Sequence, residues 1–438
     1  MGRETFLPSV SLRNIFFAMK NSCRKLPFFN RLRKYTKLLC IESVLIFLLF
    51  ACSSAQSSKL KDDELIKKEA AKTTKKAIKT GASRVDKYIK YLVGKSVGVV
   101  ANQTSQVGTV HLVDTLLGRG VNILRVFSPE HGFRGDADAG EKVVSSLDEK
   151  TGLPLVSLYG KNKKPTAEQV NDLDWIIFDI QDVGARFYTY ISSLHYVMES
   201  AAEHGVKVLV LDRPNPNGSR IDGPVLNEKF TSFVGMHPVP ILHGMTVGEY
   251  AKMINGEGWL EGGLKCELTV IKMQNYKHRD TYSLPIAPSP NLRSDQAIQL
   301  YPSLCLFEGT NVSVGRGTKQ PFEIFGHPDF SDSLFSFTPI SGYGAKFPKH
   351  ENNICYGFDL GDEEVGEELS LNFLLKAYSL SENKDEFFEN ERFFNLLAGN
   401  DVLIQQIKNE MSEVEIRLSW EEGLVAYLEI RSNYLIYD

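Results

Sequence analysis

Helical and strand patterns alternate along the chain between residues 82 and 273, and no other feature of the sequence restricts the fold as much. Apolar runs that are typical of buried strands occur at 96–101, 121–127, 155–160, 174–180 and 207–211. Segments with helical periodicity alternate with them, at 82–93, 111–117, 167–173, 192–204 and 247–259. Repeated strand–helix units predict an α/β fold, in which a Rossmann-like domain over residues 82–275 carries a mostly parallel sheet with helices on both faces.

The composition changes after residue 275. The segment from Leu284 to Asn291 is rich in proline, and its stiff, extended backbone suits a linker that crosses a cleft. Further along, strand patterns at 357–360 and 426–430 mix with helical patterns at 370–378 and 402–411. We therefore expect a smaller α+β domain over residues 276–438, packed on the first domain.

The predicted strands end in polar residues. Asn102 follows the first strand, Glu130 the second, Asp182 the fourth and Asp212 the fifth. Open α/β sheets bind ligands at the carboxyl ends of their strands, so we expect these side chains to face a common site. No Gly-x-Gly-x-x-Gly motif follows the first strand and no P-loop motif occurs, so the sequence does not favour a nucleotide ligand.

The loop after the second predicted strand combines acid, base and glycine. Pro129 lacks a backbone donor and ends the strand, and Glu130 and His131 follow it. Burial beside Phe127 and Phe133 would raise the pKa of the Glu130 carboxyl, which suits a group that donates a proton. His131 can orient Glu130 or contact the ligand, and a hydrogen-bonded loop histidine explains it equally well.

A second loop, from Glu308 to Thr318, is dense in glycine and in side chains that form hydrogen bonds. Arg316 lies within it between two glycines, and arginine binds a carboxylate through two parallel hydrogen bonds. Arg186, which follows Asp182, is the other candidate cation. The loop therefore predicts a site for a carboxylate or a sugar, and we prefer Arg316 over Arg186 for it.

The overall composition is that of a globular protein with room for two domains, since the 438 residues are 42% hydrophobic and 24% charged. The net charge of -4 gives no reason to expect nucleic acid as a partner. Neither a Cys-x-x-Cys motif nor a clustered Cys/His signature occurs, so we expect no metal and no cofactor.

The amino-terminal part has the pattern of an export signal. A basic stretch precedes a short apolar run, Val44 to Ala51, which is shorter than the roughly 20 residues of a membrane span. Leu49-Phe50-Ala51-Cys52 resembles a bacterial lipobox, so residues 1–52 are predicted to be a lipoprotein signal peptide with lipid on Cys52. The alternative is an uncleaved anchor, and Met19 is an alternative start. Residues 53–81 are predicted to be a flexible tether that leaves the protein anchored to a membrane, by lipid only, in the periplasm of a Gram-negative bacterium.

Six blocks in the same order resemble the exo-β-N-acetylmuramidase family of peptidoglycan hexosaminidases, and the resemblance covers nearly all of residues 95–438. The blocks are Ser128-Pro129-Glu130-His131-Gly132, Asp179 to Tyr190, Asp212-Arg213-Pro214-Asn215-Pro216, His243-Gly244-Met245-Thr246, Pro288-Ser289-Pro290-Asn291, and Glu308 to Thr318. The resemblance implies two domains with the site between them, and release of N-acetylmuramic acid from the non-reducing ends of peptidoglycan fragments. Glu130 stands at the family's proposed catalytic position. Asn217 departs from the pattern, because the family often has an apolar residue there.

These patterns together give a set of candidate site residues. The catalytic candidates are Glu130, His131 and Asp182. The substrate-binding candidates are Asn102, Arg186, Tyr188, Asp212, Asn215, Asn291, Glu308, Asn311, Arg316 and Glu323. The second catalytic group stays open among Asp182, Glu308, Glu323 and the substrate's own 2-acetamido group.

Two other classes of protein fit parts of the sequence. A lipid-anchored solute-binding protein for amino sugars would also have two α/β domains and a cleft, but it would have no use for Glu130. A metal-dependent hydrolase would use Asp179, Asp182 and His131, although these residues lack a fixed ligand spacing. Release of sugar in the presence of a chelator distinguishes the glycosidase from both the solute-binding protein and the metal-dependent hydrolase.

Overall fold

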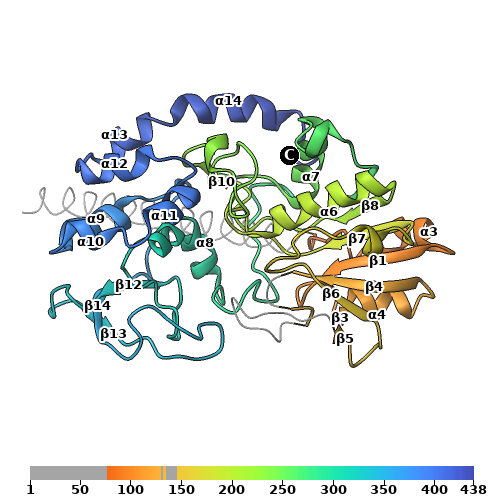
Figure 1. Ribbon diagram of the computed structural model, residues 1–438, viewed down its shortest axis with the longest axis horizontal. Helices are drawn as coiled ribbons and strands as arrows, with labels where there is room; N and C mark the ends of the chain where they lie inside the picture. The colour runs from red at the N-terminus through yellow and green to blue at the C-terminus, as the bar shows by residue number, and fades with distance from the viewer. Residues whose placement is uncertain (1–75, 130–131, 135–145) are drawn as a thin grey trace, which may run out of the picture. The chain divides into compact units, whose positions relative to one another are not determined.

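The computed structural model describes residues 76–129, 132–134 and 146–438 (Figure 1). Residues 77–438 form one compact unit, and the description below concerns that unit. Glu130, His131 and Cys52 lie outside the described residues, as does nearly all of the predicted signal peptide and tether. Within the described residues, no helix has the length and apolar character needed to cross a membrane.

A seven-stranded sheet organises the first half of this unit (Figure 1). Its order is β11 (Leu268–Ile271), β8 (Lys207–Leu211), β7 (Trp175–Asp179), β1 (Ser96–Ala101), β4 (Asn122–Ser128), β6 (Pro154–Ser157) and β5 (Ser146–Leu147). Every pair is parallel except β5 with β6. The six parallel strands have the 3-2-1-4-5-6 order of a Rossmann sheet, so the predicted fold class is confirmed.

Helices cover both faces of the sheet because its strands are apolar on both sides. One face packs against α3 (Val85–Leu92) and α4 (Leu112–Leu117). The other face packs against α5 (Ala167–Val170), α6 (Tyr190–His204) and α7 (Val247–Gly256). Along β1 the side chain of Val99 enters the first core and that of Val100 enters the second.

The amino terminus of α7 shows why the helix starts where the sequence predicts. The Thr246 hydroxyl accepts a hydrogen bond from the backbone N–H of Glu249, and the Glu249 carboxylate accepts one from the N–H of Thr246. This capping box satisfies two backbone donors that a helix end leaves unpaired. Helix α7 thus begins soon after β10, at the end of the long connection that follows β8.

The second half of the unit combines a small sheet with many helices. The sheet has the antiparallel order β12 (Ile324–His327), β14 (Cys355–Asp359) and β13 (Phe335–Phe337). The helices are α8 (Asp295–Leu304), α9 (Asn372–Leu380), α10 (Lys384–Phe387), α11 (Glu391–Ala398), α12 (Val402–Lys408), α13 (Glu413–Leu418) and α14 (Glu421–Ser432). The larger hydrophobic core continues from the first half into this region.

Short elements complete the unit. They are β2 (Gln106–Val107), β3 (Val110–His111), β9 (Ile221–Asp222), β10 (Leu242–His243), and the 3₁₀ turns η1 (Glu228–Phe230), η2 (Glu261–Gly263) and η3 (Cys305–Gly309).

One predicted element is wrong, since residues 426–430 form part of helix α14 and not a strand. Tyr427 and Arg431 are buried while Leu428 and Ile430 are exposed, which is the spacing of one helical face. The alternation of large apolar residues was mistaken for strand periodicity. The helix runs from α13 towards α7 (Figure 1), and the chain end after it returns to the sheet, where the Tyr437 hydroxyl donates to Oδ2 of Asp212 at 2.6 Å.

Candidate active site

Two cavities share Arg316. The smaller, which we call the tyrosine cavity, has a volume of about 100 Å³. It is lined by Phe187, Tyr188, Thr189, Tyr190, Ser289, Asn291, Leu292, Tyr301, Arg316 and Phe322. The structure therefore brings together three predicted substrate-binding residues, Tyr188, Asn291 and Arg316, from segments that are far apart in the sequence.

The larger of the two, which we call the lysine cavity, has a volume of about 420 Å³. Its lining consists of Glu308, Val312, Ser313, Val314, Arg316, Gly344, Ala345, Lys346, Phe347, Pro348, Lys349 and Glu389. Small-molecule sites have volumes of about 300–1,000 Å³, so this cavity is large enough for a sugar residue and the tyrosine cavity alone is not.

Arg316 is held at the boundary between the cavities. Its Nε donates to Oε1 of Glu308 at 2.8 Å, and its guanidinium lies 4.9 Å from the ring centre of Phe322. Burial alone would lower the pKa of Arg316, but the ion pair with Glu308 outweighs it and the net shift is upward. Within the described part of the chain the two Nη groups have no protein acceptor, so a charged, fork-shaped donor is left for a ligand.

The backbone around Arg316 depends on glycine. Gly315 and Gly317 have φ angles of 75° and 81°, which side-chain-bearing residues rarely adopt. A Cβ on Gly315 would lie 2.4 Å from Ile324, and a Cβ on Gly317 would lie 2.6 Å from a backbone oxygen of Ile340. The two glycines therefore allow the loop to pack closely and to turn the arginine towards the cavities.

The tyrosine cavity lies against the carboxyl end of β1. Nδ2 of Asn102 donates to the Tyr190 hydroxyl at 3.0 Å, and Tyr190 packs edge to face on Tyr188 with ring centres 4.9 Å apart. Gln103 donates to the carbonyls of Ala287 and Pro288, both at 3.2 Å, in the proline-rich segment. Strand β4 lies beside β1, and the chain leaves it through Pro129 towards residues 130 and 131.

Asp182 lies behind this edge and lines neither cavity. It is 3% exposed, and its Oδ2 accepts the backbone N–H of Gly184 at 2.7 Å and lies 3.8 Å from Nε2 of His243. Burial raises the pKa of its carboxyl to about 7, against the opposing effect of the N–H groups of Gly184 and Val183. Because it is enclosed and lines neither cavity, the Asp182 carboxyl is not placed to attack a sugar in either one.

Arg186 is fully buried and binds backbone. Its Nη1 donates to the carbonyls of Pro224 and Val239 and its Nη2 to that of Leu397, each at 2.8 Å. Burial lowers its pKa to about 9. The guanidinium thus joins the segment after β7 to α11, and this geometry favours a structural role and leaves Arg316 as the cation next to the cavities.

Asp212 and Asn215 form a hydrogen-bond network at the amino terminus of α7. Both carboxylate oxygens of Asp212 are used, Oδ1 by the N–H of Gly248 and Oδ2 by the hydroxyls of Thr246 and Tyr437. Asn215 donates to the carbonyl of Met245 at 2.9 Å. Neither residue lines the tyrosine or the lysine cavity, so their contacts support the loop after β8.

The remaining substrate-binding candidates lie elsewhere. The Glu323 carboxylate accepts a hydrogen bond from the Ser294 hydroxyl at the start of α8. Asn311 lines a separate cavity of about 570 Å³ near α10, and its carbonyl accepts from His350 at 2.6 Å. The structure therefore does not bring these two side chains together with Arg316.

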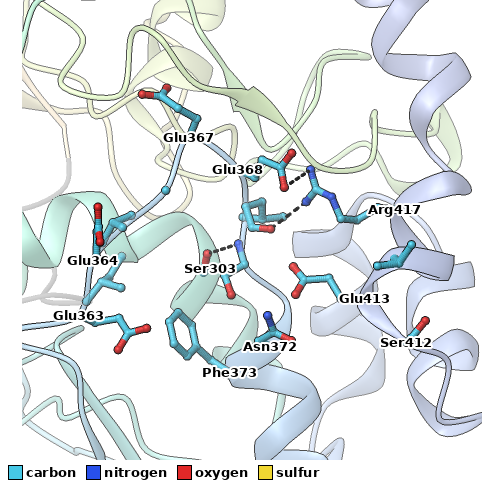
Figure 2. A pocket seen from close by; sticks show the side chains of 16 residues that line it. Ser303, Glu363, Glu364, Glu367, Glu368, Asn372, Phe373, Ser412, Glu413 and Arg417 are labelled. Carbon is cyan, nitrogen blue, oxygen red and sulfur yellow. Dashed lines mark hydrogen bonds and ion pairs between the residues drawn. The ribbon is translucent and has the colours of Figure 1, made fainter.

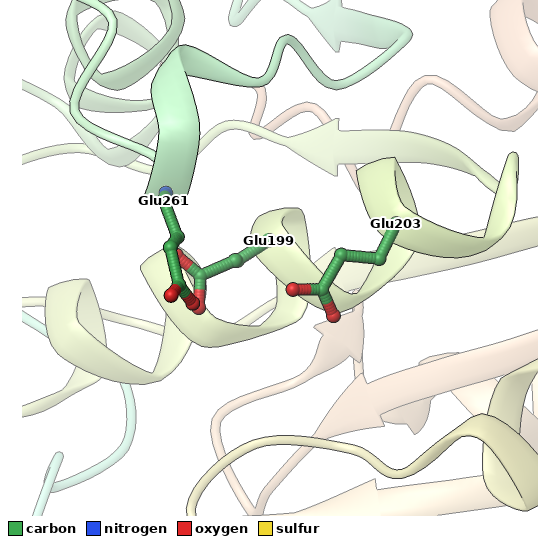
Figure 3. Close-up of side chains that lie close together, drawn as sticks. All are labelled: Glu199, Glu203 and Glu261. Atoms are coloured by element: carbon green, nitrogen blue, oxygen red, sulfur yellow. The ribbon is translucent and has the colours of Figure 1, made fainter.

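Some of the carboxylates that could hold a metal ion are paired with cations of the described residues. Asp179 receives two hydrogen bonds from Arg213, at 2.6 and 2.9 Å. Glu199, Glu203 and Glu261 come close together at α6 and η2 (Figure 3). The ammonium of Lys164 bonds Glu199 at 2.8 Å and Glu203 at 2.7 Å and so supplies the positive charge there.

The most voluminous of the described cavities, about 890 Å³, contains none of the predicted site residues. Five glutamates line it, Glu363, Glu364, Glu367, Glu368 and Glu413, and its one arginine, Arg417, is paired with Glu368 (Figure 2). Arg417 also pairs with Asp222. An acidic surface repels a carboxylate. Size alone would select this cavity, but charge selects the cavities at Arg316 for an anionic sugar.

Sequence reasoning did not assign Tyr190, Tyr301 or Phe322 to the site, although all three line the tyrosine cavity. Tyr301 packs edge to face on Tyr188 and on Phe322, with ring centres 5.8 and 5.1 Å away. Phe322 has a φ of 61°, which is a strained backbone for a bulky residue. The clustering of aromatic residues after Asp182 was the available signal for Tyr190, but nothing local marked Tyr301.

Comparisons with known proteins identify the family of the chain. Residues 97–296 match the amino-terminal model and residues 299–437 the carboxyl-terminal model of the family described as exo-beta-N-acetylmuramidase NamZ. The chain is 40% identical over 385 residues to peptidoglycan beta-N-acetylmuramidase NamZ of Bacillus subtilis (strain 168), which covers 80% of this chain and 89% of that protein.

Solved structures resemble the fold. A DUF1343 family protein from Bacteroides fragilis NCTC 9343 matches with a TM-score of 0.77 and 43% identity, over 83% of this chain and 99% of that one. A second DUF1343 family protein from the same organism matches with a TM-score of 0.68 and 28% identity, over 82% and 99%. The two family models meet between residues 296 and 299, whereas the sequence analysis places the domain boundary after residue 275. Taken with the family models and the B. subtilis relative, these matches show that the chain belongs to the exo-β-N-acetylmuramidase NamZ family.

Proposed function

We propose that this protein is an exo-acting β-N-acetylmuramidase that hydrolyses non-reducing terminal N-acetylmuramic acid from peptidoglycan fragments, as in cell-wall turnover and recycling. Membership of the family supports the reaction. The observation that supports the substrate is Arg316, a cation on the shared wall of two cavities whose Nη groups have no acceptor among the described residues.

The substrate carries a feature that this cation can recognise. N-acetylmuramic acid differs from N-acetylglucosamine by a lactyl ether that ends in a carboxylate. The Nη groups of Arg316 can take that carboxylate through two parallel hydrogen bonds, and the aromatic rings of Tyr188, Tyr301 and Phe322 limit access of water around it. An enzyme that acts only on the muramic sugar needs such a contact, because the sugar rings of the two residues are otherwise alike.

Bond cleavage requires an acid that protonates the leaving oxygen. We assign this role to Glu130, on its position in the Glu-His-Gly motif and at the family's proposed catalytic position, with His131 beside it. For the second group, Glu308 is the one candidate carboxylate that lines a cavity with Arg316, while Asp182 and Glu323 are bonded elsewhere. Glu308 or the substrate's own 2-acetamido group therefore remains for this role.

Incubation with a disaccharide that carries N-acetylmuramic acid at its non-reducing end tests the proposal. We expect equal amounts of free N-acetylmuramic acid and N-acetylglucosamine, with the same rate in the presence of a chelator. Tight binding of the disaccharide without cleavage would instead identify a solute-binding protein, and loss of cleavage on chelation would identify a metal-dependent hydrolase.

We also propose that the protein is a lipoprotein of the periplasm, held on a membrane by lipid on Cys52. The Leu-Phe-Ala-Cys sequence after a basic and an apolar stretch supports this proposal. Replacement of Cys52 by alanine should move the protein from the membrane fraction to the soluble fraction. If Cys52→Ala stays in the membrane fraction, the apolar stretch itself is the anchor.

A further inference from the structure

The lysine cavity carries Arg316 and Glu308 on one wall, but no part of the substrate is assigned to its other wall. It shares Arg316 and Glu308 with the predicted site, yet its far wall, residues 344–349, belongs to none of the sequence motifs. Because Arg316 separates the two cavities, a ligand whose carboxylate binds this arginine also borders the lysine cavity. The question is which part of the substrate the far wall contacts.

The far wall is fixed to the predicted site by backbone contacts. Nδ2 of Asn291 donates to the carbonyl of Gly344 at 2.6 Å, and the N–H of Ile340 donates to the carbonyl of Gly317 at 2.9 Å. Lys349 anchors the other end through the carbonyl of Thr310 and, at 2.8 Å, through Glu389. The wall is therefore built in place and does not depend on the ligand for its order.

The rim of this wall exposes an aromatic ring. Phe347 is 84% exposed, the highest value among the large hydrophobic residues that the structure describes as exposed. Phe347 lines the lysine cavity, so its exposed ring can lose apolar surface to water-free contact when a ligand binds there. The flat face of such a ring is suited to the apolar C–H face of a pyranose.

The charge of the cavity has one sign in excess. Arg316 is paired with Glu308 and Lys349 with Glu389, which leaves Lys346 as the third cation among three cations and two carboxylates. The Lys346 ammonium lies 5.9 Å from the ring centre of Phe347, so the two groups are close enough to contact one ligand. A peptidoglycan strand presents apolar sugar faces together with the carboxylates of its muramic residues.

We propose that the lysine cavity is a subsite for the saccharide on the reducing side of the cleaved bond, with Phe347 stacked on a sugar ring and Lys346 next to a carboxylate further along the strand. The inference rests on the proposed muramidase function and adds that the enzyme contacts the strand beyond its terminal sugar. The volume of about 420 Å³ accommodates one sugar residue, and the exposed rim leaves the strand free to continue into solvent.

Two substrates with the same terminal sugar test this subsite. The β-fluoride of N-acetylmuramic acid has no saccharide on its reducing side, whereas a tetrasaccharide that begins with N-acetylmuramic acid has three. Phe347→Ala should lower kcat/KM for the tetrasaccharide about tenfold, which is about 1.4 kcal/mol, and leave kcat/KM for the fluoride within about twofold. Lys346→Gln should affect the tetrasaccharide in the same direction and less. Phe335→Ala and Lys319→Gln, exposed residues that line neither cavity, are the matched controls and should behave as wild type on both substrates.

The outcomes separate this inference from the proposed function. If wild type cleaves neither substrate, the muramidase function fails. If wild type cleaves both and Phe347→Ala reduces both equally, or neither, the saccharide subsite is wrong. A loss that appears only when the terminal muramic acid carries a stem peptide would also overturn it, because the cavity would then hold peptide.

Discussion

Two groups of polar residues have similar chemistry but different surroundings. One group follows strands β7 and β8, and the other lies within residues 289–316. Asp182, Arg186 and Asp212 are each at most 3% exposed, and their hydrogen bonds go to backbone or to other buried groups. Arg316 and Glu308 are about 30% exposed and line cavities. A polar side chain at the carboxyl end of a strand can thus serve the connection that follows the strand, and only its contacts distinguish this from ligand binding.

The difference has a physical cause in the long connections between the strands. The segments after β7 and β8 turn sharply and pack against α7, α11 and the chain end, so their backbone carbonyls are removed from water. Buried carbonyls and N–H groups need partners, and Arg186, Asp212 and Asn215 supply them. The loop around Arg316 packs through glycines instead, and its cation lies on the walls of two cavities.

The largest effect on activity is expected at Glu130. Glu130→Gln keeps shape and hydrogen bonding but cannot donate the proton, so activity on natural fragments should fall by about 10²–10⁴ with an unchanged thermal midpoint. The variant should retain more activity on an aryl glycoside with an acidic phenol as leaving group, because the phenolate departs without protonation. Near wild-type cleavage of natural fragments would move the acid to another residue, and an unfolded variant would make Glu130 structural.

The largest effect on stability is expected at Arg186. Arg186→Met removes the donors to three buried carbonyls, those of Pro224, Val239 and Leu397. Each unsatisfied buried group costs about 1–3 kcal/mol, so the loss should be roughly 3–5 kcal/mol, measured by denaturant unfolding. The folded fraction should keep its preference for the muramic sugar. If the unfolding midpoint is unchanged and the preference for the muramic sugar is lost, Arg186 and not Arg316 binds the carboxylate.

A smaller effect, on selectivity, is expected at Arg316. Loss of a bidentate contact to a carboxylate should cost roughly 2–4 kcal/mol in Arg316→Ala, seen as weaker inhibition by N-acetylmuramic acid and a lower kcat/KM on the muramic substrate. Inhibition by N-acetylglucosamine should change little. Arg417→Ala, in the acidic cavity of Figure 2, is the control and should leave both inhibition constants unchanged. Equal losses for the two sugars would assign the carboxylate to another group.

Much of the fold was predictable, because its signals are local. The five runs predicted as strands and the caps at Thr166 and Thr246 depend on residues within a few positions of each other. The segment at 426–430 was not predictable, since its large apolar residues fit both a strand and one face of α14. Burial of Tyr427, whose hydroxyl donates to the carbonyl of His243, decides between the two.

The site was predictable in part. Arg316 stood out because it lies between two glycines, and Asn291 because of the prolines around it. The roles of Arg186 and Asp212 depend on partners such as Leu397 and Tyr437, which are more than 200 residues away. No local pattern reports such contacts. Tyr301 and Phe347 were missed because each reaches its cavity through contacts distant in sequence, Tyr301 with Tyr188 and Phe347 with the loop around Arg316.

The smallest effect on activity is expected at Asp182. Its pKa is about 7 in the folded protein and about 3.9 in an unfolded chain, so folding retains a proton that the unfolded chain releases. The free energy of unfolding should therefore fall as the pH rises from about 4 to about 7. Asp182→Asn removes this dependence and should gain stability relative to wild type across that window, with activity within about threefold. A loss of about 10²-fold or more would instead make Asp182 a catalytic group.

A crystal structure of the protein with bound N-acetylmuramic acid tests the central claim most directly, because the claim is that charge and not cavity size selects the site. We expect the lactyl carboxylate within hydrogen-bonding distance of the Nη groups of Arg316, with the sugar on the tyrosine-cavity side of this arginine and the lysine cavity left for the next saccharide. Arg186 should keep its three carbonyl partners unchanged. A sugar bound in the cavity of Glu363 and Glu413, or a carboxylate bound to Arg186, would contradict the account.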